Sequence, residues 1–416
     1  MAEKLTGNMA AYDAYLRGID FASRPGQTPG DGRKAADAFA EAVRLDPEFA
    51  QAWARLSGAS AGLFFLHFDG TERRKEMARS AAETATRLNP AAPETMLANA
   101  YYRYHVQRDY AGARELFEKI RREVPSSNEA LEALARIARR QSRWRESIRL
   151  FEEATKLNPR DAHLFMDRSW TFSAVREHAP TLEMIERAEA IAPNDPDVLE
   201  NKALFFLSTG NLGAARSVLE RIPPAAKKTD IRIVVMTYER RYAEAARILE
   251  QKLSDPSEAQ PQDGSTSREW LGFLRSLAGD AEGAKNAYLQ AEEELEKLAR
   301  EQPKNFNVSG SLARAEAGLG NKEAALREAE RGVAALPASE DPVFGSIAEE
   351  NLATVEAQVG EHDRAITRIE RLLQTPYGAF PLTQAKLRLD PIWDPLRSHP
   401  RFKTIIEGPE PKTIFN

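Results

Sequence analysis

Cysteine is absent from the 416-residue chain, and this absence excludes disulfide bridges, thiolate zinc sites, iron–sulfur clusters and cysteine nucleophiles. An excess of one charge is also missing, since 58 Lys and Arg face 63 Asp and Glu for a net charge of −5. That balance argues against a nucleic-acid-binding protein that works through bulk positive charge. The longest near-apolar stretch, residues 61–68, is far too short to cross a bilayer. We therefore expect no nucleic-acid partner and no membrane span in this chain.

What the chain does contain is a repeat with a period of 34 residues. In several repeats a small, a bulky and a small or medium residue recur at positions i, i+4 and i+7, followed five residues later by proline, although the sixth and seventh repeats lack this proline. The first three positions share one face of a helix, where small side chains let a second helix approach closely, and proline ends the helix. Three windows in strict register are Ala113-Phe117-Ile120-Pro125, Ser147-Phe151-Ala154-Pro159 and Thr181-Ile185-Ala188-Pro193.

A second apolar helical stretch precedes each window, so each repeat is predicted to be a pair of helices. Gly279, Gly320 and Gly360 are expected to close first helices, because glycine readily adopts the positive φ that such turns use. No pattern of period two competes, and we predict an all-α fold of about ten helix pairs. The predicted pairs start near residues 10, 50, 94, 128, 162, 196, 228, 267, 306 and 342.

This pattern resembles the tetratricopeptide repeat. Trp53 and Leu56 match the aromatic residue and the leucine of its first helix, and Leu271-Gly272 match its Leu-Gly pair. The resemblance implies a right-handed α–α superhelix, in which each pair packs on its neighbours. The Pro-rich residues 387–416 are expected to form a C-terminal cap, with Trp393, Leu396 and Phe402 covering the last apolar helix face.

The polar residues 254–267, which include two prolines, are predicted to be a linker. They divide the expected array into an N-terminal block, residues 1–253, and a C-terminal block, residues 268–386. The capping segment and tail, residues 387–416, follow.

The two ends of the chain carry a narrower resemblance. Residues 10–18 and 387–402 look like the opening and closing segments of repeat modules in bacterial membrane-linked regulators, namely winged-helix regulators, class III adenylate cyclases and Ser/Thr kinases. The resemblance implies a sensory or partner-binding region. Its location is then periplasmic if the region is excised from such a regulator, and cytoplasmic if the chain is free-standing.

Residues for chemistry are sparse. The six histidines are scattered without the His-Glu-x-x-His spacing of a zinc site, and residues 26–34 do not complete a phosphate-binding loop. The abundant carboxylates single out no acid–base pair. We assign no catalytic, metal-binding or cofactor-binding residue, and we expect no cofactor and no enzymatic activity.

What remains is a surface for binding. In such a superhelix positions 2, 5, 9 and 12 of each first helix point into a concave groove. The aromatic and Arg residues among them suit a protein or peptide partner, an extended segment with an acidic residue beside an apolar one. Candidate contacts in the four first helices that start at 94, 128, 162 and 196 are Tyr102, His105, Arg136, Arg139, Met166, Trp170 and Leu204.

Other interpretations of the same residues stay open. Trp170 is equally typical of packing between neighbouring repeats, and the Arg cluster of a solvated face. A clamp for the free C-terminal tails of chaperones is disfavoured, because Ala98/Tyr102 and Glu132/Arg136 do not supply its Lys and Asn. A small-ligand sensor that uses Trp170 and the segment 64–68, or an enzyme built on the solenoid, are the remaining alternatives.

Overall fold

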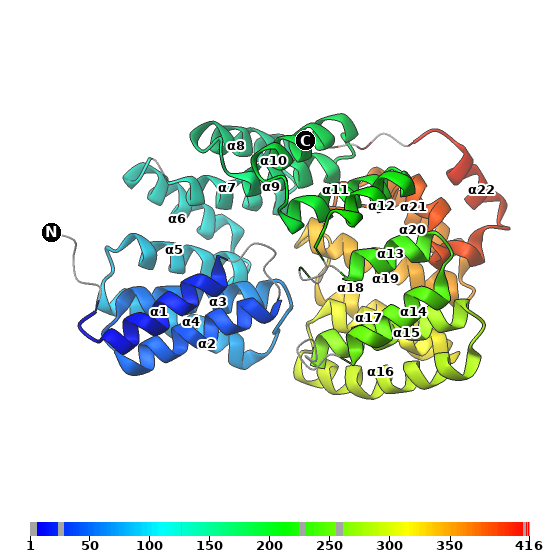
Figure 1. Cartoon of the computed structure of the whole chain (residues 1–416), viewed down its shortest axis with the longest axis horizontal. Coiled ribbons are helices and arrows are strands. Elements are labelled where there is room, and N and C mark those ends of the chain that lie inside the picture. The colour runs from blue at the N-terminus through cyan, green and yellow to red at the C-terminus, as the bar shows by residue number, and fades with distance from the viewer. Residues whose placement is uncertain are drawn as a thin grey trace. The chain divides into compact units, whose positions relative to one another are not determined.

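The computed structural model describes residues 6–23, 29–125, 127–223, 226, 229–254, 261–410, 413 and 415, without the side chains of 261–265. The described residues form helices and turns and include no β-strand (Figure 1). Among them, no helix combines the length and the apolar character that crossing a membrane requires.

Ten helix pairs follow one another along the described chain, as the 34-residue pattern predicts. Their bounds are α1 (Met9–Ala22) with α2 (Pro29–Leu45), α3 (Ala50–Phe65) with α4 (Glu72–Leu88), α5 (Pro93–Tyr101) with α6 (Tyr110–Glu123), α7 (Asn128–Arg140) with α8 (Trp144–Leu157), α9 (Ala162–Ala174) with α10 (His178–Ile191), α11 (Pro196–Ser208) with α12 (Leu212–Glu220), α13 (Thr229–Tyr238) with α14 (Tyr242–Leu253), α15 (Pro261–Leu277) with α16 (Ala281–Glu301), α17 (Phe306–Leu319) with α18 (Lys322–Ala335), and α19 (Pro342–Gln358) with α20 (His362–Gln374). In the third pair the short π-helix η1 (Tyr102–Gln107) extends α5.

The repeat signature works as the sequence predicts. The small residues Ala113, Ala154 and Ala188 and the bulky residue Phe151 are buried, and the second helices α8 and α10 end two residues before their prolines. A Cβ at Gly272 would lie 2.6 Å from the ring of Tyr288 in the paired helix α16, so glycine is needed for that close approach.

One residue in the left-handed region closes the first helix of nine pairs. Gly279, Gly320 and Gly360 do so with φ of 84°, 84° and 86°, as predicted. At the other six turns the left-handed residue is Gly210 in one case and a residue other than glycine in five cases. These five are His67, Arg108, Ser142, Arg176 and Arg240, with φ of 61°, 54°, 57°, 58° and 62°. Their backbone strain, of order 1 kcal/mol each, has to be offset by other contacts.

The predicted linker is wrong in its second half. Residues 261–267 are the first turns of α15, which begins six residues before the predicted start at 267. Pro261 lies at the first helical position, where its missing N–H costs nothing, and this explains why a Pro-bearing polar stretch is helical. Residues 255–260 lie outside the described residues. A boundary at 254–260 stays a prediction.

The described chain forms two compact units whose division falls elsewhere. Unit 1 is Met1–Ala138 with Arg149–Pro159, and unit 2 is Arg139–Ile148 with Arg160–Asn416. In unit 1 the side-chain bonds join neighbouring repeats. Arg33 Nη1 donates to the carbonyl oxygen of Phe68 at 3.2 Å, and Arg108 Nη2 lies 3.3 Å from His67 Nε2.

In unit 2 the chain returns on itself. Arg140 donates to both carboxylate oxygens of Asp341 at 3.2 and 3.3 Å, although 201 residues separate them. The Thr383 hydroxyl donates to the carbonyl oxygen of Ser208 at 2.8 Å, and Arg240 forms two bonds to Asp394 at 2.6 and 3.1 Å. The segment after α20 therefore lies along the turns that close α11 and α13.

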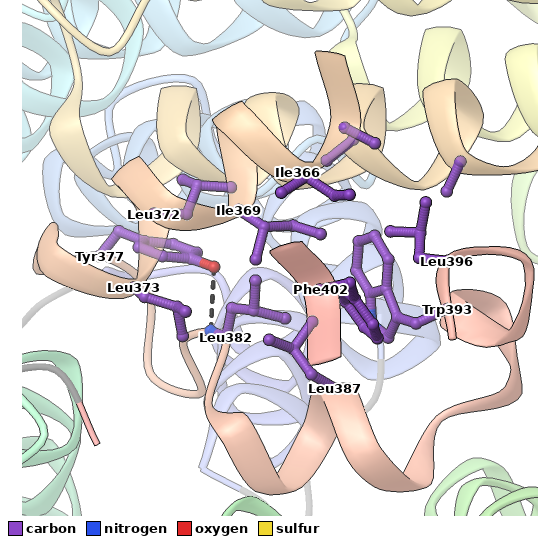
Figure 2. Close-up of a cluster of buried hydrophobic side chains, with 13 residues drawn as sticks. Ile366, Ile369, Leu372, Leu373, Tyr377, Leu382, Leu387, Trp393, Leu396 and Phe402 are labelled. Carbon is purple, nitrogen blue, oxygen red and sulfur yellow. Dashed lines mark hydrogen bonds between the residues drawn. The ribbon is translucent and has the colours of Figure 1, made fainter. Parts of the chain in front are cut away.

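The C-terminal segment also covers the last helix, and here the predicted cap is confirmed. It consists of α21 (Gln384–Leu389), the 3₁₀-helix η3 (Pro391–Leu396) and α22 (Pro400–Glu407). Figure 2 shows Trp393, Leu396 and Phe402 packed with Ile366 and Ile369 of α20. Tyr377 lies in the same cluster, where its hydroxyl accepts a bond from the backbone N–H of Leu382 at 2.9 Å.

Candidate partner-binding site

Among the positions expected to face the groove, the ninth position of the first helices shows the most regular exposure. Tyr102, Arg136, Trp170 and Leu204, which are 34 residues apart, are all half-buried. The fifth and twelfth positions vary, since Ala98, Met166, Ser173 and Leu207 are buried while Glu132 and Glu200 are half-buried. Of the four positions expected to line the groove, only the ninth offers accessible side-chain surface in all four of these repeats.

In unit 1, Tyr102 and His105 lie on the π-helix η1, where a wider turn changes the direction of the following side chains. Tyr102 packs against Ala61 and Ala78, and burial raises the pKa of its hydroxyl. The His105 ring stacks on Phe65 with 4.5 Å between ring centroids. His105 is thus part of an aromatic cluster, and Tyr102 keeps one accessible edge.

Arg136 is more accessible than the other candidate arginine, Arg139. Its Nη2 donates to Glu132 Oε2 at 3.1 Å, one turn earlier on α7, and about a third of its side chain is exposed. The neighbouring Tyr101 is half-buried, and the desolvation of its hydroxyl together with the Glu129 carboxylate holds the pKa of that hydroxyl well above the usual value. The cation of Arg136 is therefore the charged group that this face offers to an acidic partner residue.

In unit 2, two expected groove residues are structural instead. The Arg139 guanidinium is 11% exposed and lies 3.5 Å from the Asp167 carboxylate, with a further bond of 3.3 Å to the Thr171 hydroxyl. Met166 is 5% exposed and belongs to the core between α9 and α10. Their expected place in an open groove is wrong, because α9 covers the end of α7 and Met166 faces the paired helix.

Trp170 and Leu204 keep intermediate exposure in unit 2. The Trp170 indole N–H donates to Asn201 Oδ1 at 3.0 Å, and Asn201 Nδ2 in turn donates to the Ser169 hydroxyl at 2.9 Å. Leu204 packs at the edge of the cluster formed by α11, α12 and α13. The Trp170 ring is thus fixed by the next repeat while part of it stays accessible, a combination of the two interpretations that the sequence left open.

The other candidate sites receive less support. Phe65, at the centre of the segment considered for a small ligand, is buried between Tyr104 and His105. Within the described parts of the chain, no group of three His, Asp or Glu side chains is arranged to hold a metal ion.

Sequence reasoning did not single out two arginines that form long-range bonds within unit 2, Arg140 and Arg176. Arg176 sends Nη2 to the carbonyl oxygen of Leu372 at 2.8 Å and Nε to that of Leu382 at 3.2 Å. Arg140 is nearly buried against Asp341. Both partners come from the other end of unit 2, so no local signal in the sequence marks either residue.

Comparison with known proteins identifies the class of fold. The tetratricopeptide repeat family model matches residues 95–162 and 132–172. This stretch, which contains α6, α7 and α8, is a run of tetratricopeptide repeats. No curated protein matches the chain.

Solved structures of other repeat proteins resemble it at low identity. A tetratricopeptide repeat protein from Parabacteroides merdae is 16% identical, with 62% of this chain and 97% of that chain covered and a TM-score of 0.44. Pseudomonas aeruginosa pilF is 17% identical over 51% of this chain and 90% of its own, with a TM-score of 0.35. YrrB, a tetratricopeptide repeat protein described as having an unusual peptide-binding site, is 17% identical over 45% and 91%, with a TM-score of 0.27.

Proposed function

We propose that the chain is a non-catalytic scaffold that binds a protein or peptide partner on the faces of its first helices. The observation that carries the proposal is the regular half-burial of the ninth-position residues Tyr102, Arg136, Trp170 and Leu204. These side chains are of the aromatic, cationic and apolar kinds that dominate binding energies at protein interfaces. A helix face held in place by its neighbours presents them without a large loss of conformational entropy on binding.

The chemistry of the partner follows from these residues. An acidic side chain suits Arg136, and an apolar side chain suits the exposed parts of Trp170 and Leu204. The partner we propose is an extended segment that carries acidic and apolar residues. A role in a bacterial signalling protein is the finer form of this proposal and rests on the resemblance of the end segments.

Selection from a random peptide library against the immobilised chain tests the proposal. We expect enrichment of peptides that carry acidic and apolar residues, and we expect Arg136→Glu to weaken their binding by about 1–4 kcal/mol. The matched control is Arg187→Glu, because Arg187 also pairs with a glutamate one turn earlier, Glu183 at 2.9 Å, but lies on the second helix α10. Equal losses in both variants, or no enriched peptides, would refute the proposal.

Trp170→Ala provides a second measurement. If Trp170 binds the partner through its accessible edge, the affinity falls in proportion to the lost surface while helical content is kept. Thermal unfolding is followed alongside, because the bond to Asn201 and the packing on α10 predict some loss of stability as well. A Trp170→Ala chain that melts far below the parent but binds the selected peptides normally would assign Trp170 to packing alone.

A further inference from the structure

The end of the chain rests on an apolar surface of unit 2. The last helix, α22, ends at Glu407, yet the ring of Phe415 packs against the cluster of Trp144 and Val175. The cluster is built from three separate helices, and its members are Trp144, Ala174, Val175 and Val343, with Phe344 at its edge.

Two cationic side chains contact the same end of the chain. Arg176 Nη1 donates to the Thr413 hydroxyl at 3.1 Å, and the Arg145 guanidinium carbon lies 5.2 Å from the centroid of the Phe415 ring. Arg176 is itself almost buried, so its direction is set by the protein and not by the tail. The surface therefore recognises a hydroxyl and an aromatic ring two residues apart.

The tail can leave this surface at little cost. Among the described residues that follow α22, Gly408 and Pro409 accept bonds from Gln384 Nε2 at 3.2 and 3.0 Å, and Glu410 Oε1 lies 3.5 Å from the backbone nitrogen of Gln384. When Thr413 departs, Arg176 keeps its bonds to the backbone carbonyls of Thr375 and Leu382, so no buried donor loses its only partner. Terminal segments with few buried contacts detach locally without unfolding the domain.

We propose that the surface around Trp144 is a docking site for a peptide that carries an aromatic residue with a hydroxyl residue two positions before it, and that the chain's own tail fills it in cis. A partner segment of this chemistry binds when it displaces Thr413 and Phe415. The site lies at the start of α8 and at the turn after α9, apart from the ninth-position residues on which the proposed function rests.

A labelled peptide of residues 410–416, Glu-Pro-Lys-Thr-Ile-Phe-Asn, is the probe. We expect it to bind a chain that ends at Gly408 and to bind the full chain at least about tenfold more weakly, because the covalently attached tail competes at a high effective concentration. The full chain with Phe415→Ala keeps its length and all its helices, and it should bind the probe nearly as well as the shortened chain does.

Matched variants identify the site. Arg145→Ala in the shortened chain should lower the affinity for the probe by about two- to fivefold, because the cation beside the Phe ring is lost. Arg187→Ala should leave that affinity unchanged. Arg136→Glu should leave this affinity unchanged, which separates the result from the test of the proposed function. The proposal fails if neither the shortened chain nor the Phe415→Ala chain binds the probe, or if a probe with Phe415→Ala binds equally well.

Discussion

The two units of this chain use the same repeat and hold it together differently. In unit 1 the bonds run between neighbouring pairs, as from Arg33 to the Phe68 carbonyl. In unit 2, Arg140 reaches Asp341 and Arg176 reaches Leu382, each about 200 residues away in sequence. A solenoid whose repeats contact only their neighbours is stabilised pair by pair, and its ends fray independently. Closing the array couples distant pairs, so unit 2 should unfold as one body while unit 1 should not.

Removal of residues 387–416 breaks the closure most severely. It exposes Ile366 and Ile369, and the loss of Trp393 and Phe402 alone removes packing that costs about 3–5 kcal/mol per large aromatic residue. We expect calorimetry to show that the transition of unit 2 is lost or strongly lowered and that of unit 1 is kept. Light scattering should show oligomers, because the uncovered apolar face associates. A monomeric truncated chain with an unchanged melting profile would contradict the role of the cap.

Breaking one buried ion pair is the next largest change. Arg140→Ala leaves the fully buried Asp341 carboxylate without its cation, and we expect unit 2 to lose about 3–5 kcal/mol in urea unfolding. The control in unit 1 is Arg121→Ala, since Arg121 lies 2.9 Å from Glu153 in a pair whose side chains are 41% and 32% exposed, and such a pair contributes at most about 1 kcal/mol. Equal losses of stability for the two variants would mean that the long-range ion pair between Arg140 and Asp341 does not stabilise unit 2 more than a surface pair does.

Arg176 and Arg108, whose backbones both lie in the left-handed region, allow a further comparison of the two units. Arg176→Gly relieves backbone strain of about 1 kcal/mol but removes charged hydrogen bonds to Leu372 and Leu382, so we expect a net loss of about 1–2 kcal/mol. Arg108→Gly in unit 1 relieves the same strain and should change stability by no more than about 1 kcal/mol. Denaturation midpoints of both variants decide this. A larger loss of stability for Arg108→Gly than for Arg176→Gly would contradict the stabilising role of the Arg176 hydrogen bonds.

The smallest effect is expected from a single cut between α14 and α15. Limited proteolysis should cleave first at residues 254–260, because the sequence of this segment is polar, includes Pro256 and supplies little apolar surface for packing. The two fragments should still elute together on gel filtration, since the bonds of Arg140 and Arg176 to the C-terminal segment join them. Fragments that separate without denaturant would show that the closure is weak. Early cleavage within residues 128–193 would contradict the placing of the repeats.

Much of the architecture could be predicted from the sequence, because its causes are local. The positions of Ala113, Phe117 and Pro125 are enough to predict a helix, its packed face and its end. The groove positions 2, 5, 9 and 12 were expected for the same reason, since a constant period carries one face from helix to helix, and their role in binding stays a prediction. His105 shows where the constant period fails. It lies on a π-helix, whose wider turn gives side chains another direction than the α-helical period predicts.

Adjacent residues on α7 show where sequence reasoning ends. Arg139 and Arg140 are equivalent in the sequence, yet one pairs with Asp167 in the next first helix and the other with Asp341 near the far end of unit 2. The sequence alone determined the repeat, the pairing of its helices and the C-terminal cap. Only the tertiary structure decided which side chains close unit 2 and where the tail lies. The reason is physical: each repeat adds a small rotation to the next, and the position of the last pair depends on the sum of all of them.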